Sequence, residues 1–220
     1  METFEFGDKP LLLIIILFSL SLLPLIVVIG SSFLKIAMVL SLLRNALGIQ
    51  QVPPNMAIYG MALILSLFIM APVAYEITDN ISNDPFSLED ENLYEKVDMK
   101  IIYPWRAFLQ KNTQEKQIEF FSEKATQFWP EQMREKITDE SLFVILPAFM
   151  VSQLIEAFKI GFLLYLPFIA IDLIVSNILL AMGMMMVSPM TISLPFKILI
   201  FVMVGGWERL FSQLVFSFYK

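Results

Sequence analysis

The fold is decided by residues 162–197, FLLYLPFIAIDLIVSNILLAMGMMMVSPMTISLPFK. As a helix, its first part, 162–182, is long enough to cross the roughly 30 Å hydrocarbon core of a bilayer. Gly183 and Pro189 then interrupt the apolar sequence, with three consecutive methionines between them. Apolar sequence resumes over 192–204, but this segment is too short to span alone. The stretch therefore predicts a helical hairpin with a broken, methionine-rich tip.

The composition of the whole chain also indicates apolar surroundings. Of its 220 residues, 57% are hydrophobic and 16% are charged, and the mean hydropathy is +0.71. A typical globular chain is about 25% charged, so we expect an integral membrane protein or a protein buried in a large hydrophobic assembly. The chain has no cysteine and no histidine, which excludes disulfides, ordinary zinc or iron–sulfur sites, and Cys- or His-based catalysis. We expect no metal, no cofactor and no nucleic acid, since no basic stripe is present.

The N-terminal part, residues 1–75, is expected to consist of hydrophobic helices. The acidic start lacks the features of a cleavable signal, so we expect it to remain in the mature chain. Pro24 should kink the first helix, and QQVPPN (50–55) should form a turn. The predicted helices are 11–29, 33–47 and 55–75.

Residues 76–141 form a polar insert of different composition, with 15 acidic and 8 basic residues. Its first part, 78–92, is predicted to be a loop, and 104–128 is predicted to be one helix that ends before Pro130. We expect the insert to lie on the periplasmic side and to pack against neighbouring components. The apolar stripe of its helix comprises Trp105, Phe108, Leu109, Phe121, Ala125 and Phe128.

The C-terminal part, residues 142–220, is again hydrophobic. Pro147 suits the first turn of a helix running into the 160s, and the spanning segment 162–182 follows. WERLFSQLVFSFYK (207–220) predicts an amphipathic helix suited to an interface or a partner's groove. Its apolar face comprises Trp207, Leu210, Phe211, Leu214, Val215 and Phe218.

Two basic residues, Lys35 and Arg44, lie near the first short connection between helices. By the positive-inside rule this connection is inside, which places the termini and the insert outside. Two interpretations of these side chains stay open. They line a polar path or pair with acids of a neighbour, or they anchor a helix at the lipid surface.

Three charged residues of the apolar C-terminal part are candidate site residues. Glu156 and Lys159 are three residues apart on one helix face, so they can neutralise each other. Asp172 is isolated in apolar sequence, where a charge is costly and faces protein or water. Two roles stay open for Asp172. It takes part in a proton or ion relay, or it forms an inter-subunit hydrogen bond, and we favour the hydrogen bond.

The methionines Met184, Met185 and Met186 also have two interpretations. Methionine fills irregular gaps in a core. Alternatively, the loop repeated around a ring of subunits forms a soft gasket, because irregular backbone at membrane depth is tolerated only inside protein or beside a water-filled cavity.

Two long blocks resemble a known family. They are SSFLKIAMVLSLLRNALGIQQVPPN (31–55) and PAFMVSQLIEAFKIGFLLYLPFIAIDLIVSNILLAMGMMMVSPMTISLPFK (147–197), followed by GGW (205–207). The combination of LRNALG, AFKIGF, PFIAIDL and GMMMVSP resembles the FliP/SctR family, the export-gate subunit of flagellar and virulence-type type III secretion systems. The absence of a cleavable signal favours the injectisome branch.

The resemblance implies an all-α, membrane-associated subunit of a helical, ring-like assembly in the bacterial inner membrane, projecting toward the periplasm. It implies no enzymatic activity. About five copies would join S-type and T-type export-apparatus subunits and larger ring components in a closed pore for unfolded proteins. Met184, Met185 and Met186 match the family's gasket. The family's inter-subunit polar contacts match Lys35, Arg44, Glu156, Lys159 and Asp172.

Two positions depart from the family pattern, and one rival function stays open. Gln153 stands where the family has glutamate, and Gly205 replaces an aspartate before Gly-Trp. The rival is a small-ion or proton-coupled transporter that uses Asp172 and the Glu156/Lys159 pair.

Overall fold

The computed structural model describes residues 10–49, 52–84, 92–134 and 138–219. These residues form helices and short connections without strands, which confirms the all-α prediction. The N-terminal residues 1–9, part of the predicted turn (50–51) and part of the predicted loop (85–91) lie outside the described residues.

Three apolar helices form the N-terminal part: α1 (Pro10–Ile29), α2 (Phe33–Leu47) and α3 (Asn55–Asn83). Pro24 lies inside α1 without ending it. The bounds predicted for α2 are confirmed, and the helix ends at Gly48 with a left-handed φ of 81°. The amides of Gly48 and Ile49 donate to carbonyls of the last turn, as glycine-terminated helices commonly do.

Helix α3 corrects the predicted boundary at residue 75. It continues to Asn83, so 78–83 is helical and not loop. Polar side chains there bond back along the helix: the Ser82 hydroxyl donates to the Thr78 carbonyl, and the Asn83 amide donates to the Asp79 carboxylate. These i to i−4 bonds satisfy the polar side chains within the helix, where composition alone predicts a loop.

The insert contains more helix breaks than predicted. Its described elements are α4 (Leu93–Val97), the π-helix η2 (Asp98–Ile102), α5 (Tyr103–Lys111), α6 (Glu115–Phe128) and α7 (Glu131–Arg134). The single helix predicted over 104–128 is wrong, because the chain turns between α5 and α6. There the Asn112 and Thr113 side chains donate to the carbonyls of Phe108 and Leu109, ending α5. Phe128, expected on the apolar stripe, is exposed.

The C-terminal part contains α8 (Leu142–Ala181), α9 (Pro189–Met203) and α10 (Gly206–Phe216). The two helices predicted over 147–182 are one helix of 40 residues, with Pro147 and Pro167 inside it. Proline does not end an apolar helix when neighbouring helices satisfy the freed carbonyls. The apolar face predicted for the last helix is confirmed where Leu210, Leu214 and Phe218 are buried.

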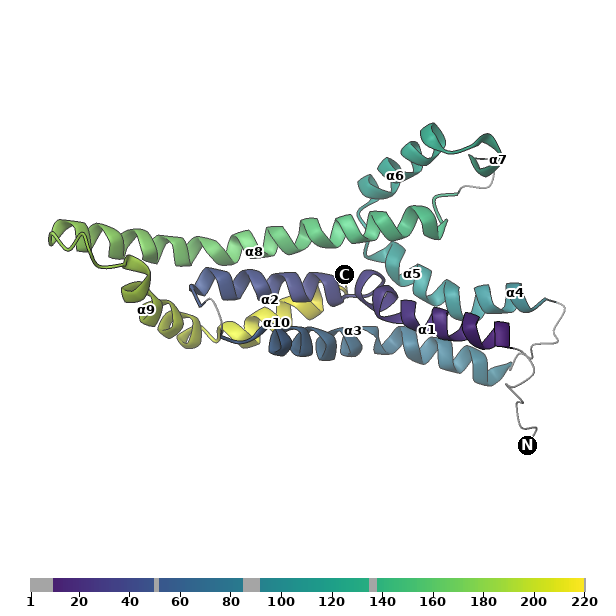
Figure 1. The fold of residues 1–220 in the computed structure, drawn as a ribbon, viewed down its shortest axis with the longest axis horizontal. Helices are drawn as coiled ribbons and strands as arrows, with labels where there is room; N and C mark the ends of the chain where they lie inside the picture. The colour runs from purple at the N-terminus through teal and green to yellow at the C-terminus, as the bar shows by residue number, and fades with distance from the viewer. Residues whose placement is uncertain (1–9, 50–51, 85–91, 135–137, 220) are drawn as a thin grey trace.

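Helix α2 lies at the centre of the molecule, with α8 along one side and α3 along another (Figure 1). The α9–α10 segment folds back from the far end of α8 toward α2, while α6 and α7 project away from the bundle (Figure 1). The main core draws on α2, α3, α8, α9 and α10. Its fully buried members include Ile36, Val39, Leu43, Ile58, Ala157 and Leu214.

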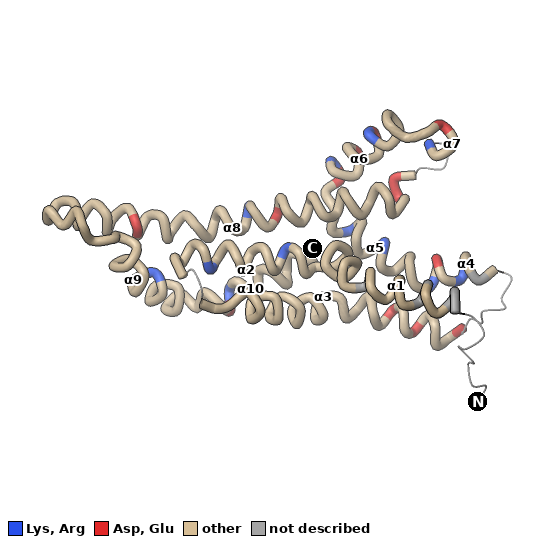
Figure 2. The backbone as a smooth tube through the Cα atoms, viewed as in Figure 1, with Lys and Arg blue, Asp and Glu red and all other residues tan. Residues whose placement is uncertain are grey.

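Two described helices, α3 and α8, are long and apolar enough to cross a membrane. The number rises to 4 if each of two bent pairs, around the α1–α2 and α9–α10 breaks, counts as one span. Charged residues are sparse along α9 and the far half of α8 and more frequent around α4 to α7 (Figure 2). This distribution fits a membrane protein with a polar insert.

The insert contacts the break between α1 and α2 at Gly30. The Trp105 indole Nε1 donates to the Gly30 carbonyl at 2.7 Å. A Cβ at Gly30 would overlap the indole ring and lie 2.9 Å from the Ile26 carbonyl oxygen. We therefore expect Gly30→Ala to lower the free energy of unfolding by about 1–3 kcal/mol, read as a lower Tm of the detergent-purified chain.

Gly60→Ala is the matched control for that substitution. Gly60 lies inside α3, and a Cβ there would meet nothing within 4 Å. Alanine in an unobstructed helix stabilises by roughly 0.5–1 kcal/mol, so the control should keep or raise the Tm. Equal Tm values for the two variants would refute the tight contact at Gly30.

Candidate functional site

The methionine loop, residues 182–188, connects α8 to α9. Helix α8 gives way at Gly183, whose φ of 74° belongs to the left-handed region that favours glycine. The amides of Gly183 and Met184 donate to the carbonyls of Leu180 and Leu179 at 3.0 and 2.9 Å. Pro189 then begins α9 in the first-turn position that suits proline. Together these features produce the compact break predicted from the sequence.

The methionine side chains project from this break into open space. Met184 is 43% exposed, Met185 is 80% exposed and Met186 is fully exposed. A Cβ at Gly183 would also meet nothing within 4 Å. Three adjacent apolar side chains at a hairpin tip are therefore available to a surface outside the chain, and they do not fill this chain's own core.

A charge cluster around the buried Lys197 joins the two helices at the base of the same hairpin. The Asp172 carboxylate of α8 accepts hydrogen bonds from Ser193 Oγ at 2.5 Å and Lys197 Nζ at 2.6 Å, both on α9. Lys197, only 2% exposed, also donates to the Ala46 carbonyl at 3.3 Å. That carbonyl lies in the last turn of α2, where the helix dipole favours a cation. The cluster thus joins α8, α9 and α2.

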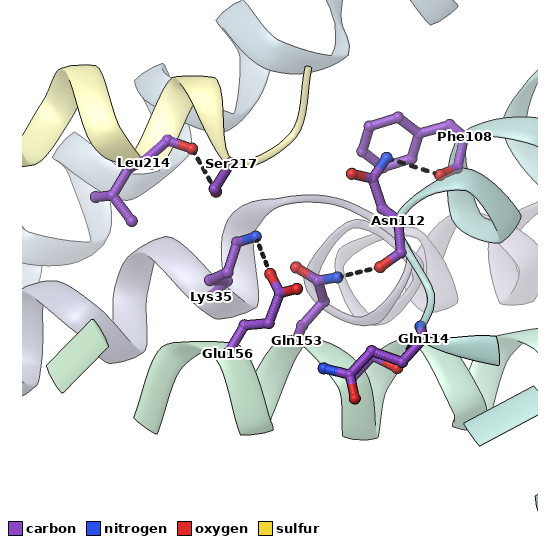
Figure 3. A network of polar contacts seen from close by, with 9 residues as sticks. Lys35, Phe108, Asn112, Gln114, Gln153, Glu156, Leu214 and Ser217 are labelled. Carbon is purple, nitrogen blue, oxygen red and sulfur yellow. Dashed lines mark hydrogen bonds and ion pairs between the residues drawn. The ribbon is translucent and has the colours of Figure 1, made fainter. Parts of the chain in front are cut away.

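A second buried lysine joins α2 to the middle of α8. Lys35 is 0% exposed, and its Nζ lies 2.7 Å from Glu156 Oε2 (Figure 3). The same ammonium lies 3.6 Å from the centroid of the Phe218 ring, a cation–π distance. The expected neutralisation of Glu156 by Lys159 is therefore corrected: Glu156 pairs with Lys35 across helices, and Lys159 is exposed.

Arg44 serves the connection between α2 and α3. Its Nη1 donates to Asn55 Oδ1 at 2.5 Å and to the Pro53 carbonyl at 3.4 Å. The side chain is half-buried, which differs from a guanidinium extended toward a lipid surface. Within this chain, Arg44 closes the turn. The sidedness predicted from Lys35 and Arg44 stays a prediction.

Comparison with known proteins gives matches over most of the chain. The sequence profile described as the FliP family matches residues 16–214. The chain belongs to the FliP family. Virulence protein YscR of Salmonella typhimurium is 56% identical over 216 residues, covering 96% of this chain and 98% of that protein.

Two further FliP-family relatives match over nearly their full length. Yop proteins translocation protein R of Yersinia pestis is 55% identical over 206 residues, covering 94% of this chain and 95% of that protein. Harpin secretion protein HrcR of Erwinia amylovora is 45% identical over 219 residues, covering 99% of this chain and 100% of that protein. These relatives confirm the family indicated by the motifs, and their names agree with the virulence-type branch.

One departure from the FliP-family pattern has a local explanation. Gln153 Nε2 donates to the Asn112 carbonyl at 2.7 Å (Figure 3). The neighbouring Ser152 Oγ accepts from the Gln114 amide at 3.1 Å. An amide side chain can donate this bond, whereas an ionised glutamate cannot. Gln153 therefore anchors the turn between α5 and α6 to α8.

Sequence reasoning missed Lys197 as a site residue. A usable signal exists, because Lys197 and Asp172 are isolated charges on opposite sides of a hairpin break in apolar sequence. Two such charges pair at lower cost than each would bear alone. For Gln153, the sequence shows the departure but not the carbonyl that it contacts.

The corrected pairing in this FliP-family chain can be tested by a double-mutant cycle. Lys35→Met and Glu156→Gln should each lower the Tm, while the double variant should lose less than the sum. We expect a coupling energy of roughly 0.5–3 kcal/mol for contacting residues. The control cycle combines Lys159→Gln with Glu156→Gln and should show additive losses. Coupling in the control cycle but not in the first would show that Glu156 pairs with Lys159 and not with Lys35.

Proposed function

We propose that this protein is a non-catalytic core subunit of a type III secretion export gate. About five copies assemble with S-type and T-type subunits around a central path for unfolded protein substrates. The assembly resides in the bacterial inner membrane and projects toward the periplasm, with larger ring components around it. Membership of the FliP family supports the assignment to a type III secretion system. The names of the relatives refer to virulence, translocation and secretion.

The observation that carries the sealing role is the exposed methionine tip. Met184, Met185 and Met186 stand at the end of the α8–α9 hairpin, where copies arranged in a ring would bring their tips together. Methionine is unbranched and polarizable, so it adapts to a changing gap without specific contacts. Converging tips close the pore by an apolar constriction and deform around a passing chain.

The remaining surface supports burial in lipid and in an assembly. Large apolar side chains are exposed along α8, far more than an isolated soluble protein presents. They include Phe158, Phe162, Leu163, Leu173, Ile174 and Ile178. In the assembly, neighbouring subunits and lipid cover this face, and the exposed Lys159 is available for an inter-subunit contact.

The internal ion pairs favour a gate over an ion-coupled transporter. A relay needs carboxylates that are free to exchange ions or protons along a path. Asp172 is instead bonded to Lys197 and Ser193, and Glu156 to Lys35. These contacts hold helices together, so we assign both acids to structural roles in the gate.

The first test is the native mass of the detergent-solubilised particle, alone and co-expressed with S-type and T-type subunits. We expect a closed particle of about five copies that gains these partners. A stable monomer or dimer that ignores them would overturn the proposal and favour the transporter.

A further inference from the structure

The tip of the α8–α9 hairpin concentrates exposed thioether sulfur at one point of the surface. Met186 is the most exposed methionine among the described residues, and Met185 is 80% exposed. Met182 precedes the three consecutive methionines and Met190 follows them, and both are exposed as well. Together with Met184, five of the chain's 14 methionines therefore lie exposed within 182–190.

Exposed thioethers react with peroxides. The sulfur lone pair attacks one peroxide oxygen, so that an S–O bond forms and the O–O bond breaks. The sulfur is oxidised to the sulfoxide, and the second oxygen of hydrogen peroxide is reduced and leaves as water with both protons. The chain has no cysteine, so methionine is the one side-chain type in it that peroxides convert reversibly.

Oxidation removes the property that suits these side chains to a seal. The thioether is apolar, whereas the sulfoxide is polar and accepts hydrogen bonds from water. A hydrophobic constriction closes by excluding water, so polar groups in its lining hydrate it. Irregular backbone at membrane depth lies inside protein or beside a water-filled cavity, and a seal across a pore has such a cavity on each side. The converging tips therefore stay within reach of a molecule as small as hydrogen peroxide.

We propose that the methionine loop is a site of reversible oxidation, at which a peroxide converts Met184, Met185 and Met186 to sulfoxides and makes the seal permeable to small ions. The inference rests on the proposed sealing role and adds a chemical regulation to it. Methionine sulfoxide reductases restore the thioether: the sulfoxide oxygen leaves as water while a dithiol is oxidised to a disulfide. MsrA and MsrB each reduce one sulfoxide epimer, so full recovery needs both.

The first measurement is the sulfoxide content of each methionine in the full-length chain, purified in detergent and within the complete particle. Both samples are treated with hydrogen peroxide, digested and analysed by mass spectrometry. We expect Met185 and Met186 to be oxidised at least about fivefold faster than Met38 and Met61, which pack against the main core. Equal rates for the two pairs in the complete particle would overturn the proposed site.

The second measurement is ion flux through the complete particle, reconstituted in vesicles, before and after treatment with hydrogen peroxide. We expect flux through the parent to rise about fivefold or more, and to return after treatment with MsrA, MsrB and dithiothreitol. The variant Met184→Leu/Met185→Leu/Met186→Leu has no sulfur at these positions and should show no peroxide-dependent rise. The control Met56→Leu/Met99→Leu/Met133→Leu removes three exposed methionines elsewhere and should show the same rise as the parent.

The outcomes separate this site from the seal on which it rests. An equal rise in the parent and the loop variant, or no rise in the parent once its loop is oxidised, would overturn the oxidation site. Replacing the same three methionines by alanine supplies the comparison. If the alanine variant leaks while the oxidised parent stays tight, the seal stands and the oxidation site is refuted. If neither leaks, both are refuted.

Discussion

Replacing Met184, Met185 and Met186 together by alanine is expected to make the resting particle leak small ions. The three side chains are the exposed tip of the α8–α9 hairpin, and alanine removes the flexible part of each. An apolar constriction that excludes water is opened by widening it. We expect ion flux to rise roughly tenfold or more, equivalent to a barrier lowered by at least ~1.4 kcal/mol, while secretion continues.

The measurement is ion flux across the membrane of cells that produce the complete secretion system. The control replaces Met56, Met99 and Met133 by alanine, three exposed methionines outside the loop. This control should leave ion flux unchanged. If the variant with Met184, Met185 and Met186 replaced by alanine showed the same ion flux as the parent, the methionine seal would be refuted. The proposed assembly would be unaffected by that result.

Leucine at the same three positions separates sealing from flexibility. Leucine keeps an apolar side chain of similar volume but is branched and adapts less well to irregular gaps. We expect this variant to remain tight at rest and to secrete more slowly than the parent. Normal secretion with a tight seal would mean that apolar volume alone matters at the tip.

The features that sequence predicted well are those encoded within one helix. The end of α2 follows from Gly48 after it. The buried face of α10 follows from its helical period, and the broken tip follows from Gly183 and Pro189. In each case the determining residues are neighbours in the chain.

The features that sequence missed depend on contacts between distant segments. Helical spacing predicts a pair between Glu156 and Lys159, yet the partner of Glu156 is Lys35, 121 residues away in the chain. The turn between α5 and α6 receives hydrogen bonds from Ser152 and Gln153 of α8, which the local pattern does not contain. Tertiary packing overrode local spacing at both places.

The cluster at the base of the hairpin should respond asymmetrically to loss of its two charges. Asp172→Leu leaves the Lys197 ammonium with its side chain 3% exposed and, among the residues that the structure describes, only the Ala46 carbonyl as a hydrogen-bond partner. The Asp172 side chain is 39% exposed. Lys197→Met therefore leaves a carboxylate that water and Ser193 can solvate. Removing the partner of a buried charge costs about 3–5 kcal/mol, so Asp172→Leu should be the more damaging change.

Particle yield and secreted substrate are the two quantities to measure for this series. We expect Asp172→Leu to lower both at least tenfold, Lys197→Met to lower them less, and the double variant to recover part of the loss. Glu208→Gln, which removes an exposed acid of α10, is the control and should match the parent. Equal losses for the two single variants would contradict the burial asymmetry.

Asp172→Asn decides between positioning and ion transport. Asparagine keeps an oxygen that can accept from Ser193 and Lys197, so the hairpin should hold and the gate should retain much of its secretion. A relay instead requires an ionisable carboxylate at this depth. Normal assembly with complete loss of function in Asp172→Asn would therefore contradict a purely positioning role and move Asp172 to the conducting path. Partial function would mean that its contacts, and not its titration, are what the export gate uses.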